Sequence, residues 1–452
     1  MPQRARLLSR SLATAVTAAV TASLLAAVPA EGEVHTDVRL APSTSTARAK
    51  PVVVPGRFTG LGFDACSAPD QSTMDELRFE SPYWGVGVYI GGPERTCSQP
   101  ALDAAWVRTQ AARGWHVFPV WVGRQSQCSD RSFVTQISAR NAKATAQGVA
   151  SANDAVRTAK RLGIGKGSTL FLDVEAYDNT TSACNQPVLS YQSGWNSRLR
   201  KLGWKGGFYS AGSSGIASIG FIKQTQPDAY SLPTAIWISS ADGKPTTDVP
   251  RFIDNGLWRH QRMHQYRIDV TRSFGAATLQ LDENAIDIGG GAKPGPPGSD
   301  CHGVPLSFVR YPLLHRGASR PEVKAVQCLL KQRGLYRPQL TQSYGAATAR
   351  GVGQFQRRHG LATTKSVNAA TWTALLSSGG TPLSKRGSTG DRVRAIQRAI
   401  AAAMGRRLNA NGVFTAETQA DVAAYQKRLS LDVARGIVGP ATWKALQAGR
   451  VR

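Results

Sequence analysis

Three acidic residues follow directly on an apolar run in the stretch TLFLDVEAYD, residues 169–178. Asp173 and Glu175 end the run, and Asp178 comes three residues later. An unpaired charge in an apolar environment costs several kcal/mol or changes its protonation state. These acids should therefore be either surface residues or a working site. Because YDNTT is typical of a solvated loop, we assign Asp178 to the surface and keep Asp173 and Glu175 as catalytic candidates.

Two further aspartates end apolar runs at the two extremes of the same region. Asp64 ends TGLGFD, and Asp282 ends ATLQLD. In a closed barrel the first and last strands are neighbours, so Asp64 and Asp282 would stand side by side and all four carboxyls would meet at the mouth. Clustered carboxylates raise at least one pKa, which supplies the general acid that glycosidic cleavage needs. For Asp64, a structural role near Cys66 is the alternative.

Aromatic and polar residues at later strand ends favour a sugar as the ligand. The candidates for substrate binding are Tyr209, Trp237, His264, Gln265 and Tyr266. An aromatic face offers an apolar surface to a pyranose ring, and the imidazole and amide groups hydrogen-bond to hydroxyls. For Tyr209 and Trp237, ordinary packing in the core is the alternative.

The scaffold for these residues is predicted by short apolar runs that alternate with helical stretches over 57–288. The runs are 59–64, 84–90, 117–122, 169–175, 206–210, 235–239, 263–266 and 277–282, and the clearest helices are 101–113, 142–162 and 187–202. Continuous apolar strands followed by helices indicate a parallel sheet covered on both faces. Eight such strands fit an α/β fold, a (β/α)8 barrel of the TIM type, better than an open sheet.

The remaining chain, 301–450, contains an internal repeat with an offset of 70 residues. YPLLHRGASRPEVKAVQCLL from Tyr311 aligns with TPLSKRGSTGDRVRAIQRAI from Thr381. After one inserted residue the alignment continues to Trp372 and Trp443. The apolar spacing predicts three short helices in each copy. We therefore expect two small all-α modules, 301–378 and 379–450.

The N-terminal 30 residues have the features of an export signal. A basic start precedes an uncharged apolar stretch, 12–27, and a small-residue cleavage site, 28–30. This stretch is short for a membrane span, so no stable membrane insertion is expected after cleavage; an uncleaved anchor is the alternative. Segments 31–56 and 289–300, rich in Ser, Thr, Ala, Pro and Gly, are predicted linkers.

The six cysteines agree with export, because an even number in a secreted chain indicates disulfides. They are Cys66, Cys97, Cys128, Cys184, Cys301 and Cys328. The first four follow the first four strands, where pairing of 66 with 97 and of 128 with 184 is simplest, although two other pairings remain open. Cys301 and Cys328 are expected to form a disulfide that joins the leading segment of the first module to its first helix. Without CxxC or HExxH spacing, the sequence implies no metal site and no organic cofactor.

Positive charge is concentrated in the repeat region. From residue 301 onward there are 24 Lys and Arg against 5 Asp and Glu, within a total formal charge of +26. Such a surplus attracts polyanions. Export favours an anionic wall glycan such as peptidoglycan over nucleic acid, and no base-reading motif is present. We expect a secreted, wall-associated monomer.

Motifs along 57–288 resemble a known family. GFDACSAP, GVYIGG, FLDVEAYD, GFYSAGSSG and MHQY are similar to the glycoside-hydrolase-like domain of unknown function in secreted actinobacterial proteins. More distantly, that domain is similar to the lysozyme family, with Asp on strand one, Asp-x-Glu on strand four and Asp on strand eight. The resemblance implies cleavage between N-acetylmuramic acid and N-acetylglucosamine. It implies Glu175 as general acid, Asp173 orienting an acetamido group or a water, and Asp64 and Asp282 stabilising positive charge at the anomeric carbon.

The repeat resembles the three-helix peptidoglycan-binding-like module of bacterial wall enzymes, through the pattern G…V…Q…(F/Y)Q…TW…L. Together, the two resemblances imply a muramidase-like hydrolase that tandem modules anchor to the wall. The alternative is a non-catalytic wall-binding protein whose barrel binds carbohydrate or acts as a scaffold.

Overall fold

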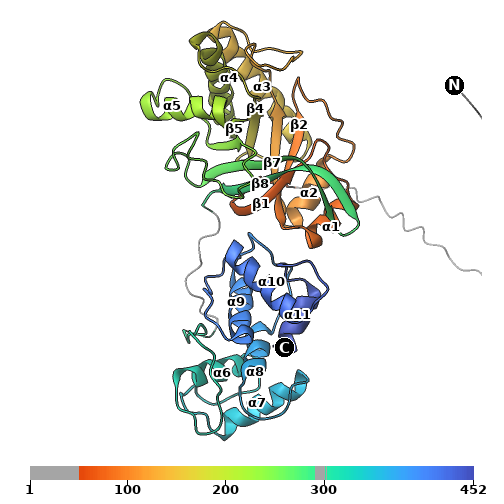
Figure 1. Cartoon of the computed structure of the whole chain (residues 1–452), viewed down its shortest axis with the longest axis vertical. Helices are drawn as coiled ribbons and strands as arrows, with labels where there is room; N and C mark the ends of the chain where they lie inside the picture. The colour runs from red at the N-terminus through yellow and green to blue at the C-terminus, as the bar shows by residue number, and fades with distance from the viewer. Residues whose placement is uncertain (1–49, 291–300, 302, 452) are drawn as a thin grey trace, which may run out of the picture. The chain divides into compact units, whose positions relative to one another are not determined.

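The eight apolar runs form the strands of a closed barrel (Figure 1). The computed structural model describes residues 50–290, 301 and 303–451. Each predicted run overlaps one strand, so the predicted barrel is confirmed. The strands are β1 (Phe58–Asp64), β2 (Tyr83–Gly91), β3 (His116–Val122), β4 (Thr169–Asp173), β5 (Lys205–Ala211), β6 (Ala235–Ser239), β7 (Gln261–Phe274) and β8 (Ala277–Ile288).

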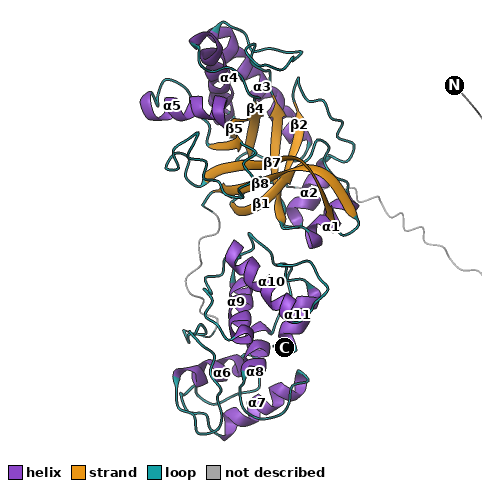
Figure 2. Cartoon of the chain, viewed as in Figure 1, coloured by secondary structure: helices purple, strands orange, loops and turns teal. Residues whose placement is uncertain are grey.

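Helices cover the outside of the strands, as Figure 2 shows in purple around the orange barrel. They are α1 (Gln71–Glu80), α2 (Ala104–Ala112), α3 (Asn141–Arg161), α4 (Ser182–Lys201) and α5 (Ala217–Thr225), the last preceded by the π-helical turn η1 (Gly212–Ile216). Inside the barrel, the rings of Phe118, Phe171 and Trp237 pack against one another with centroids 5.6–6.4 Å apart. Because both faces are covered, every residue of β4 is buried, which explains its continuous apolar sequence.

The direction of β8 differs from the all-parallel barrel that the sequence predicted. β8 pairs antiparallel with both β7 and β1, whereas the other neighbouring strands are parallel. Only Gly275 and Ala276 separate β7 from β8, which is a hairpin connection and too short for a crossover helix. Asp282 therefore lies within a reversed strand and does not end a parallel one, and the register places it directly opposite Asp64.

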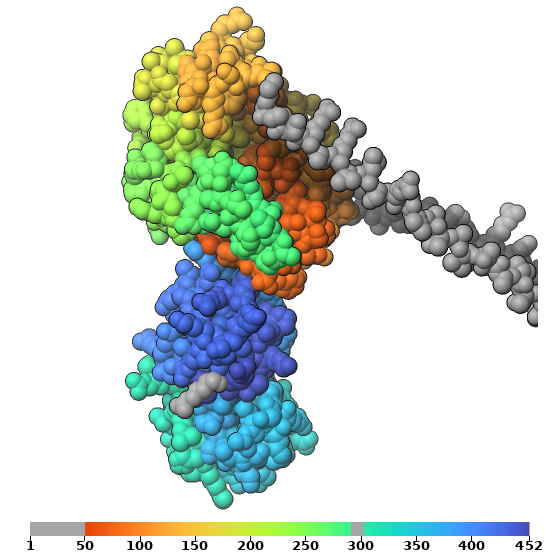
Figure 3. Space-filling model, turned by 45° about the vertical axis from the view of Figure 1, so that its right-hand side comes forward, coloured from red at the N-terminus to blue at the C-terminus, as the bar shows by residue number. Residues whose placement is uncertain are grey.

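The hairpin of β7 and β8 is tied to the first helix of the barrel. The backbone N–H of Ala276 donates to Glu76 Oε1 at 3.0 Å. On the face in Figure 3, the green segment that contains the hairpin lies against the orange-red N-terminal segment. At its base, Glu283 accepts hydrogen bonds from Arg267, Arg272 and Tyr83 at 2.7–2.8 Å. Burial raises the pKa of Glu283, but these donors outweigh that effect and lower it to about 2.

Three disulfides connect the loops in the simplest of the predicted pairings. They are Cys66–Cys97, Cys128–Cys184 and Cys301–Cys328, with Cα–Cα distances of 5.7–5.8 Å. The structure thus excludes the two other pairings of the first four cysteines. Cys66–Cys97 links the loops that follow β1 and β2, and Cys128–Cys184 links the loop after β3 to the start of α4.

The repeat region forms the two predicted three-helix modules. The first contains α6 (Pro321–Lys331), α7 (Ala346–Arg358) and α8 (Ala369–Ser377), and the second α9 (Asp391–Met404), α10 (Ala416–Arg428) and α11 (Pro440–Gln447). The matched Trp372 and Trp443 are completely buried. Each indole N–H donates at 2.8 Å to a proline carbonyl 60 or 61 residues earlier in the chain. The sequence repeat is therefore also a repeat of contacts.

Buried glutamines organise the loops of both modules. They are Gln327, Gln356, Gln397 and Gln426, each at most 2% exposed. Each donates from Nε2 to a backbone carbonyl and a threonine hydroxyl, and each accepts a backbone N–H at Oε1, all at 2.7–3.1 Å. One side chain thus satisfies several polar groups of the loop that follows its helix.

Several predicted segments lie outside the described residues. These are the export signal, 1–30, most of the first linker, 31–49, and most of the second, 291–300. At the end of the first predicted linker, Val52 N donates to Gly163 O and Val54 O accepts from Thr169 N, both at 2.9 Å. In the part of the chain that the structure describes, no helix has the length and apolarity needed to cross a membrane.

Gln356→Leu tests the role of the buried glutamines. It leaves the Lys365 N–H without its side-chain partner, and it leaves the Ser366 carbonyl with only the longer hydrogen bond from Thr364 Oγ1, at 3.3 Å. We expect the free energy of opening of the first module to fall by about 2–4 kcal/mol, because each buried polar group left unpaired costs ~1–3 kcal/mol. Hydrogen exchange of the α7 and α8 peptides measures it. Gln354→Leu, at an exposed position of the same helix, is the matched control, and equal protection in the two variants would contradict the prediction.

Candidate active site

Asp64 and Asp282 share one hydrogen-bonding side chain. The two residues face each other across β1 and β8. Gln265, on β7, places its Nε2 2.8 Å from Asp282 Oδ2 and 3.5 Å from both carboxylate oxygens of Asp64. Gln265 Oε1 accepts from the hydroxyls of Tyr209 and Ser239 at 2.9 and 3.0 Å. This amide therefore holds the two carboxyls together.

Asp64 is 1% exposed and has two further donors. Tyr89 Oη donates to Oδ2 at 2.7 Å, and Asn284 Nδ2 donates to Oδ1 at 2.6 Å. Burial raises the pKa of Asp64, and these hydrogen bonds partly offset the rise because they stabilise the ionised form. Space for this carboxylate depends on Gly87 of β2, where a Cβ would lie 2.6 Å from Asp64 Cβ and 2.9 Å from Trp237 Cη2.

Asp282 is half-buried and titrates near neutrality. Burial, followed by the charge of Asp64, raises the pKa of Asp282 to about 7. The backbone N–H of Asp269 donates to Oδ1 at 2.7 Å and limits this rise. The Asp282 carboxyl can therefore gain and lose a proton near neutral pH.

Asp173 ends β4 and is 4% exposed. Its Oδ1 is buried and has no hydrogen-bond partner among the described residues. Burial first, and then the charges of Glu175 and Asp64, raise the pKa of Asp173 well above its ordinary value. Burial and the two neighbouring charges thus favour the protonated form of Asp173, whose Oδ1 has no partner among the described residues.

Glu175 lies two residues beyond β4, and its side chain is 28% exposed. Gln125 positions it: Oε1 accepts from the Glu175 N–H at 2.7 Å, while Nε2 donates to the Asp173 carbonyl at 3.2 Å. Burial raises the pKa of Glu175, and Arg131, whose Nη1 is 3.5 Å from Glu175 Oε2, lowers it. A partly exposed carboxyl with a raised pKa is a candidate for general acid catalysis.

The loop after β3 brings Arg131 to this position. Cys128 O accepts from the Asp178 N–H at 2.9 Å, and Ser129 Oγ donates to the Ala176 carbonyl at 2.8 Å. With the Cys128–Cys184 disulfide, these bonds fix the loop beside the segment after β4. Asp178 itself is exposed and accepts from Thr180, in a turn outside the carboxyl cluster.

Trp237 and His264 do not have the positions expected of sugar-binding residues. Trp237 is 1% exposed, packs edge-on against Phe171 and donates from Nε1 to Asn284 at 2.8 Å. Trp237 therefore packs in the core of the barrel next to the cluster, in agreement with the core-packing alternative. His264 is fully buried, and its two ring nitrogens lie 2.6 and 2.9 Å from the carbonyl oxygens of Thr246 and Ser240. Neither residue has a free face or a free polar atom for a ligand.

The other three residues predicted to bind substrate differ among themselves. Gln265 is 1% exposed and uses its amide to bridge carboxyls, so it positions them and has no group left for a sugar. Tyr266, one residue further along β7, lies on the opposite face near Glu283 and Arg267. Tyr209 is partly exposed and borders the cluster, since Glu175 and Asp173 contribute, after burial, to its raised pKa.

Sequence reasoning missed four residues of the cluster: Tyr89, Gln125, Arg131 and Asn284. Two carried a recognisable signal. Tyr89 stands at the end of the second apolar run, and Asn284 lies two residues after Asp282, on the same face of the strand. Gln125 and Arg131 belong to a loop whose path only the structure gives. Among the described residues, no group of three or more His, Cys, Asp or Glu is arranged to hold a metal ion.

Comparisons with solved structures give two similar chains. One is an uncharacterized protein of B. stearothermophilus, 19% identical, with 50% of this chain and 95% of that chain covered and a TM-score of 0.33. The other is the modular autolysin LytC of Streptococcus pneumoniae, 11% identical, with 50% and 46% covered and a TM-score of 0.31. No curated protein matches the sequence significantly.

Family models match both parts of the chain. Residues 75–286 match the Rv2525c-like, glycoside hydrolase-like domain. Residues 319–375 and 389–446 each match a peptidoglycan-binding domain. The first match spans most of the barrel, including Asp173, Glu175 and Asp282, and the second spans nearly all of the helices of both modules. The chain thus contains an Rv2525c-like, glycoside hydrolase-like domain followed by two peptidoglycan-binding domains.

Proposed function

We propose that this protein is a secreted, muramidase-like glycoside hydrolase that acts on peptidoglycan. The observation that carries the proposal is the cluster of four carboxyls whose pKa values are all raised, with Asp64 and Asp282 joined through one amide. Glycosidic cleavage requires one carboxyl that keeps a proton and another that can become ionised. The raised pKa values favour the first condition, and the hydrogen bonds that Asp64 accepts favour the second.

Glu175 is the proposed general acid. Glu175 is more exposed than Asp173. Its raised pKa favours a retained proton for transfer to the leaving-group oxygen. Asp64 and Asp282 would stabilise positive charge at the anomeric carbon, because the amide of Gln265 that both share and the amide of Asn284 on Asp64 favour one ionised carboxyl between them.

Asp173 is the proposed orienting residue. It is a buried acid with an unpartnered oxygen and a strongly raised pKa, and in its protonated form it would donate a hydrogen bond to an acetamido carbonyl or to a water. Peptidoglycan sugars carry such acetamido groups. Tyr209, at the border of the cluster, is the remaining candidate for contact with the sugar.

The two modules are proposed to hold the enzyme on the wall. Their family supports peptidoglycan as the ligand. From position 301 onward they contain 24 basic and 5 acidic residues, and this excess of positive charge favours an anionic glycan. Attachment would raise the local concentration of substrate at the barrel. The disulfides and the signal-like first 30 residues support an extracellular, wall-associated location.

Glu175→Gln tests the catalytic role. With purified peptidoglycan, we expect wild type to release fragments with new reducing ends and the variant to do so about 100-fold or more slowly, since general acids contribute ~10²–10⁴-fold. Asp178→Asn, an exposed acid three residues later, is the matched control and should retain activity. Cosedimentation with the insoluble wall checks that the variants still bind.

Two outcomes would contradict this assignment. If wild type binds peptidoglycan but releases no reducing ends, the protein is a non-catalytic wall binder. If wild type and Glu175→Gln release them equally, cleavage depends on another residue.

Arg131→Gln tests the electrostatics of Glu175. The Arg131 cation lowers the pKa of Glu175, so its removal raises that pKa and the protonated form persists to higher pH. The alkaline limb of the pH–kcat/KM profile should move up by about 0.2–0.7 pH units, because exposed ion pairs contribute ~0.2–1 kcal/mol and one unit corresponds to about 1.4 kcal/mol. Arg140→Gln, at an exposed position before α3, is the control. A limb that stays in place or moves down would contradict the assignment.

A further inference from the structure

A lysine of the second module is completely buried against the barrel, within the compact unit Lys50–Arg452. Lys385 lies in the loop before α9 and is 0% exposed. Its Nζ donates to the carbonyls of Arg78 at 2.8 Å, Ser81 at 3.0 Å and Leu77 at 3.4 Å. These carbonyls surround the C-terminal end of α1, where unpaired acceptors and the helix dipole attract a cation.

Two indoles of the barrel complete the site. Lys385 Nζ lies 4.2 Å from the ring centroid of Trp84 and 5.2 Å from that of Trp115. Aromatic faces attract ammonium groups, most strongly where water is excluded. Burial, followed by the charge of Arg78, lowers the pKa of Lys385. The carbonyls and the indoles are the groups that offset this loss of solvation.

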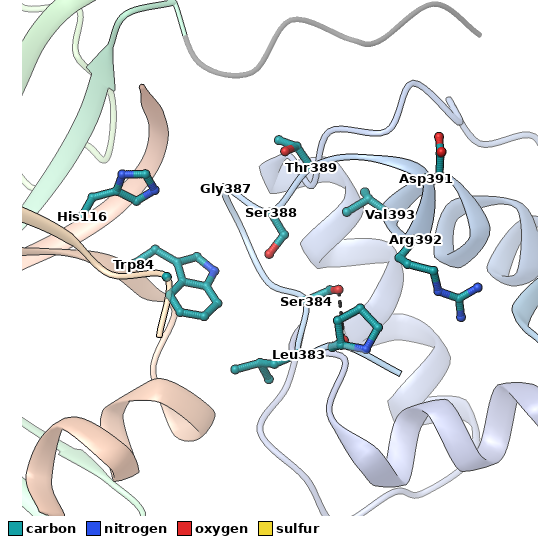
Figure 4. A pocket seen from close by; sticks show the side chains of 12 residues that line it. Trp84, His116, Leu383, Ser384, Gly387, Ser388, Thr389, Asp391, Arg392 and Val393 are labelled. Atoms are coloured by element: carbon teal, nitrogen blue, oxygen red, sulfur yellow. Dashed lines mark hydrogen bonds between the residues drawn. The ribbon is translucent and has the colours of Figure 1, made fainter. Parts of the chain in front are cut away.

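The rest of the loop, residues 383–389, also fits the barrel closely. Leu383 packs against the core of the barrel, and a Cβ at Gly387 would lie 2.5 Å from Phe58 Cε2. Beside these contacts, a groove of about 420 Å³ has Trp84 and His116 on one side and Ser384 and Gly387 on the other (Figure 4). The barrel residues begin β1, β2 and β3, so the loop contacts the end of the strands opposite the carboxyl cluster.

The first module provides an internal comparison. Its corresponding loop, 313–319, has the same backbone pairing, Leu314 with Val367 where the second module pairs Ser384 with Val438. Yet His315, the counterpart of Lys385, is exposed, and Leu313, the counterpart of Leu383, is 63% exposed. Gly317, the counterpart of Gly387, has nothing within 4 Å of a Cβ. The two loops share a scaffold and differ in what they contact.

We propose that loop 383–389 is an intramolecular docking element. In it, the Lys385 ammonium group binds the carbonyls at the C-terminal end of α1 and so couples the second module to the N-terminal end of the barrel. The corresponding loop of the first module stays free of the barrel. A module docked in this way joins the wall-binding part to the barrel without covering Asp64, Glu175 or Asp282. The proposal does not depend on whether the barrel is catalytic.

Amine labelling of the full-length native protein, read by mass spectrometry, tests the burial of Lys385. We expect Lys385 to react about tenfold or more slowly than Lys427, an exposed lysine of the same module, because labelling of a buried group requires local opening. Reaction of Lys385 at the rate of Lys427 would overturn the proposal.

A pair of glycine variants separates docking from the stability of the module. Gly387 and Gly317 have nearly the same backbone angle, φ 97° and φ 94°, so an alanine is equally strained at both. At Gly387 the alanine also clashes with the barrel. Labelling of Lys385 should therefore increase about tenfold in Gly387→Ala and remain unchanged in Gly317→Ala. Circular dichroism verifies that both variants are folded, and equal labelling of Lys385 in the two folded variants would overturn the proposal.

Discussion

The reversed direction of β8 is the constraint on which the carboxyl cluster depends. A hairpin of two residues forces β8 to run antiparallel to β7 and to β1. This register sets Asp282 opposite Asp64 and sets Asn284 opposite Gln265. Donors and carboxyls therefore alternate here, so that Asp64 and Asp282 lie side by side with hydrogen bonds to both. The remaining strands supply the second pair of acids and the walls.

Most of the barrel could be predicted because its strands are buried on both faces. Such strands have continuous apolar sequences. In a closed barrel of eight strands, each strand lies beside its neighbours in the sequence, and the last lies beside the first. The direction of β8 is not predictable in the same way, because the seventh apolar run ends at 266 whereas β7 continues to Phe274. The polar residues of this extension hid the hairpin. The sequence therefore predicts that Asp282 lies beside Asp64, but it does not predict that β8 runs antiparallel to β1.

The surroundings of the acids were harder to predict than the acids themselves. Asp64, Asp173 and Glu175 follow directly from apolar runs that end in a charge. The aromatic candidates depend on which face of a strand each side chain occupies, and a single step separates Gln265, inside the cluster, from Tyr266, outside it. Depth matters too, because Trp237 lies within β6 and fills the barrel below the cluster. Loop residues such as Arg131 are positioned by a disulfide and by backbone hydrogen bonds far apart in sequence.

The two modules illustrate how one scaffold can serve two purposes. Both copies keep the buried glutamines and the tryptophan that organise three helices, and these positions were visible in the sequence repeat. The difference lies at the loop that leads into each copy, where Lys385 replaces His315. A sequence repeat identifies the shared fold, but the contacts of such a substitution depend on the barrel beside it.

Direct titration of the carboxyls tests the central claim, that burial and proximity hold protons on this cluster near neutral pH. Nuclear magnetic resonance of isotope-labelled aspartate side chains can follow Asp282, with Asp282→Asn used to assign its signal. The account predicts a midpoint for Asp282 of about 7, which moves down in Asp64→Asn because the neighbouring charge is lost. A midpoint near the ordinary value of about 3.9 for a free aspartate, unchanged in Asp64→Asn, would contradict it.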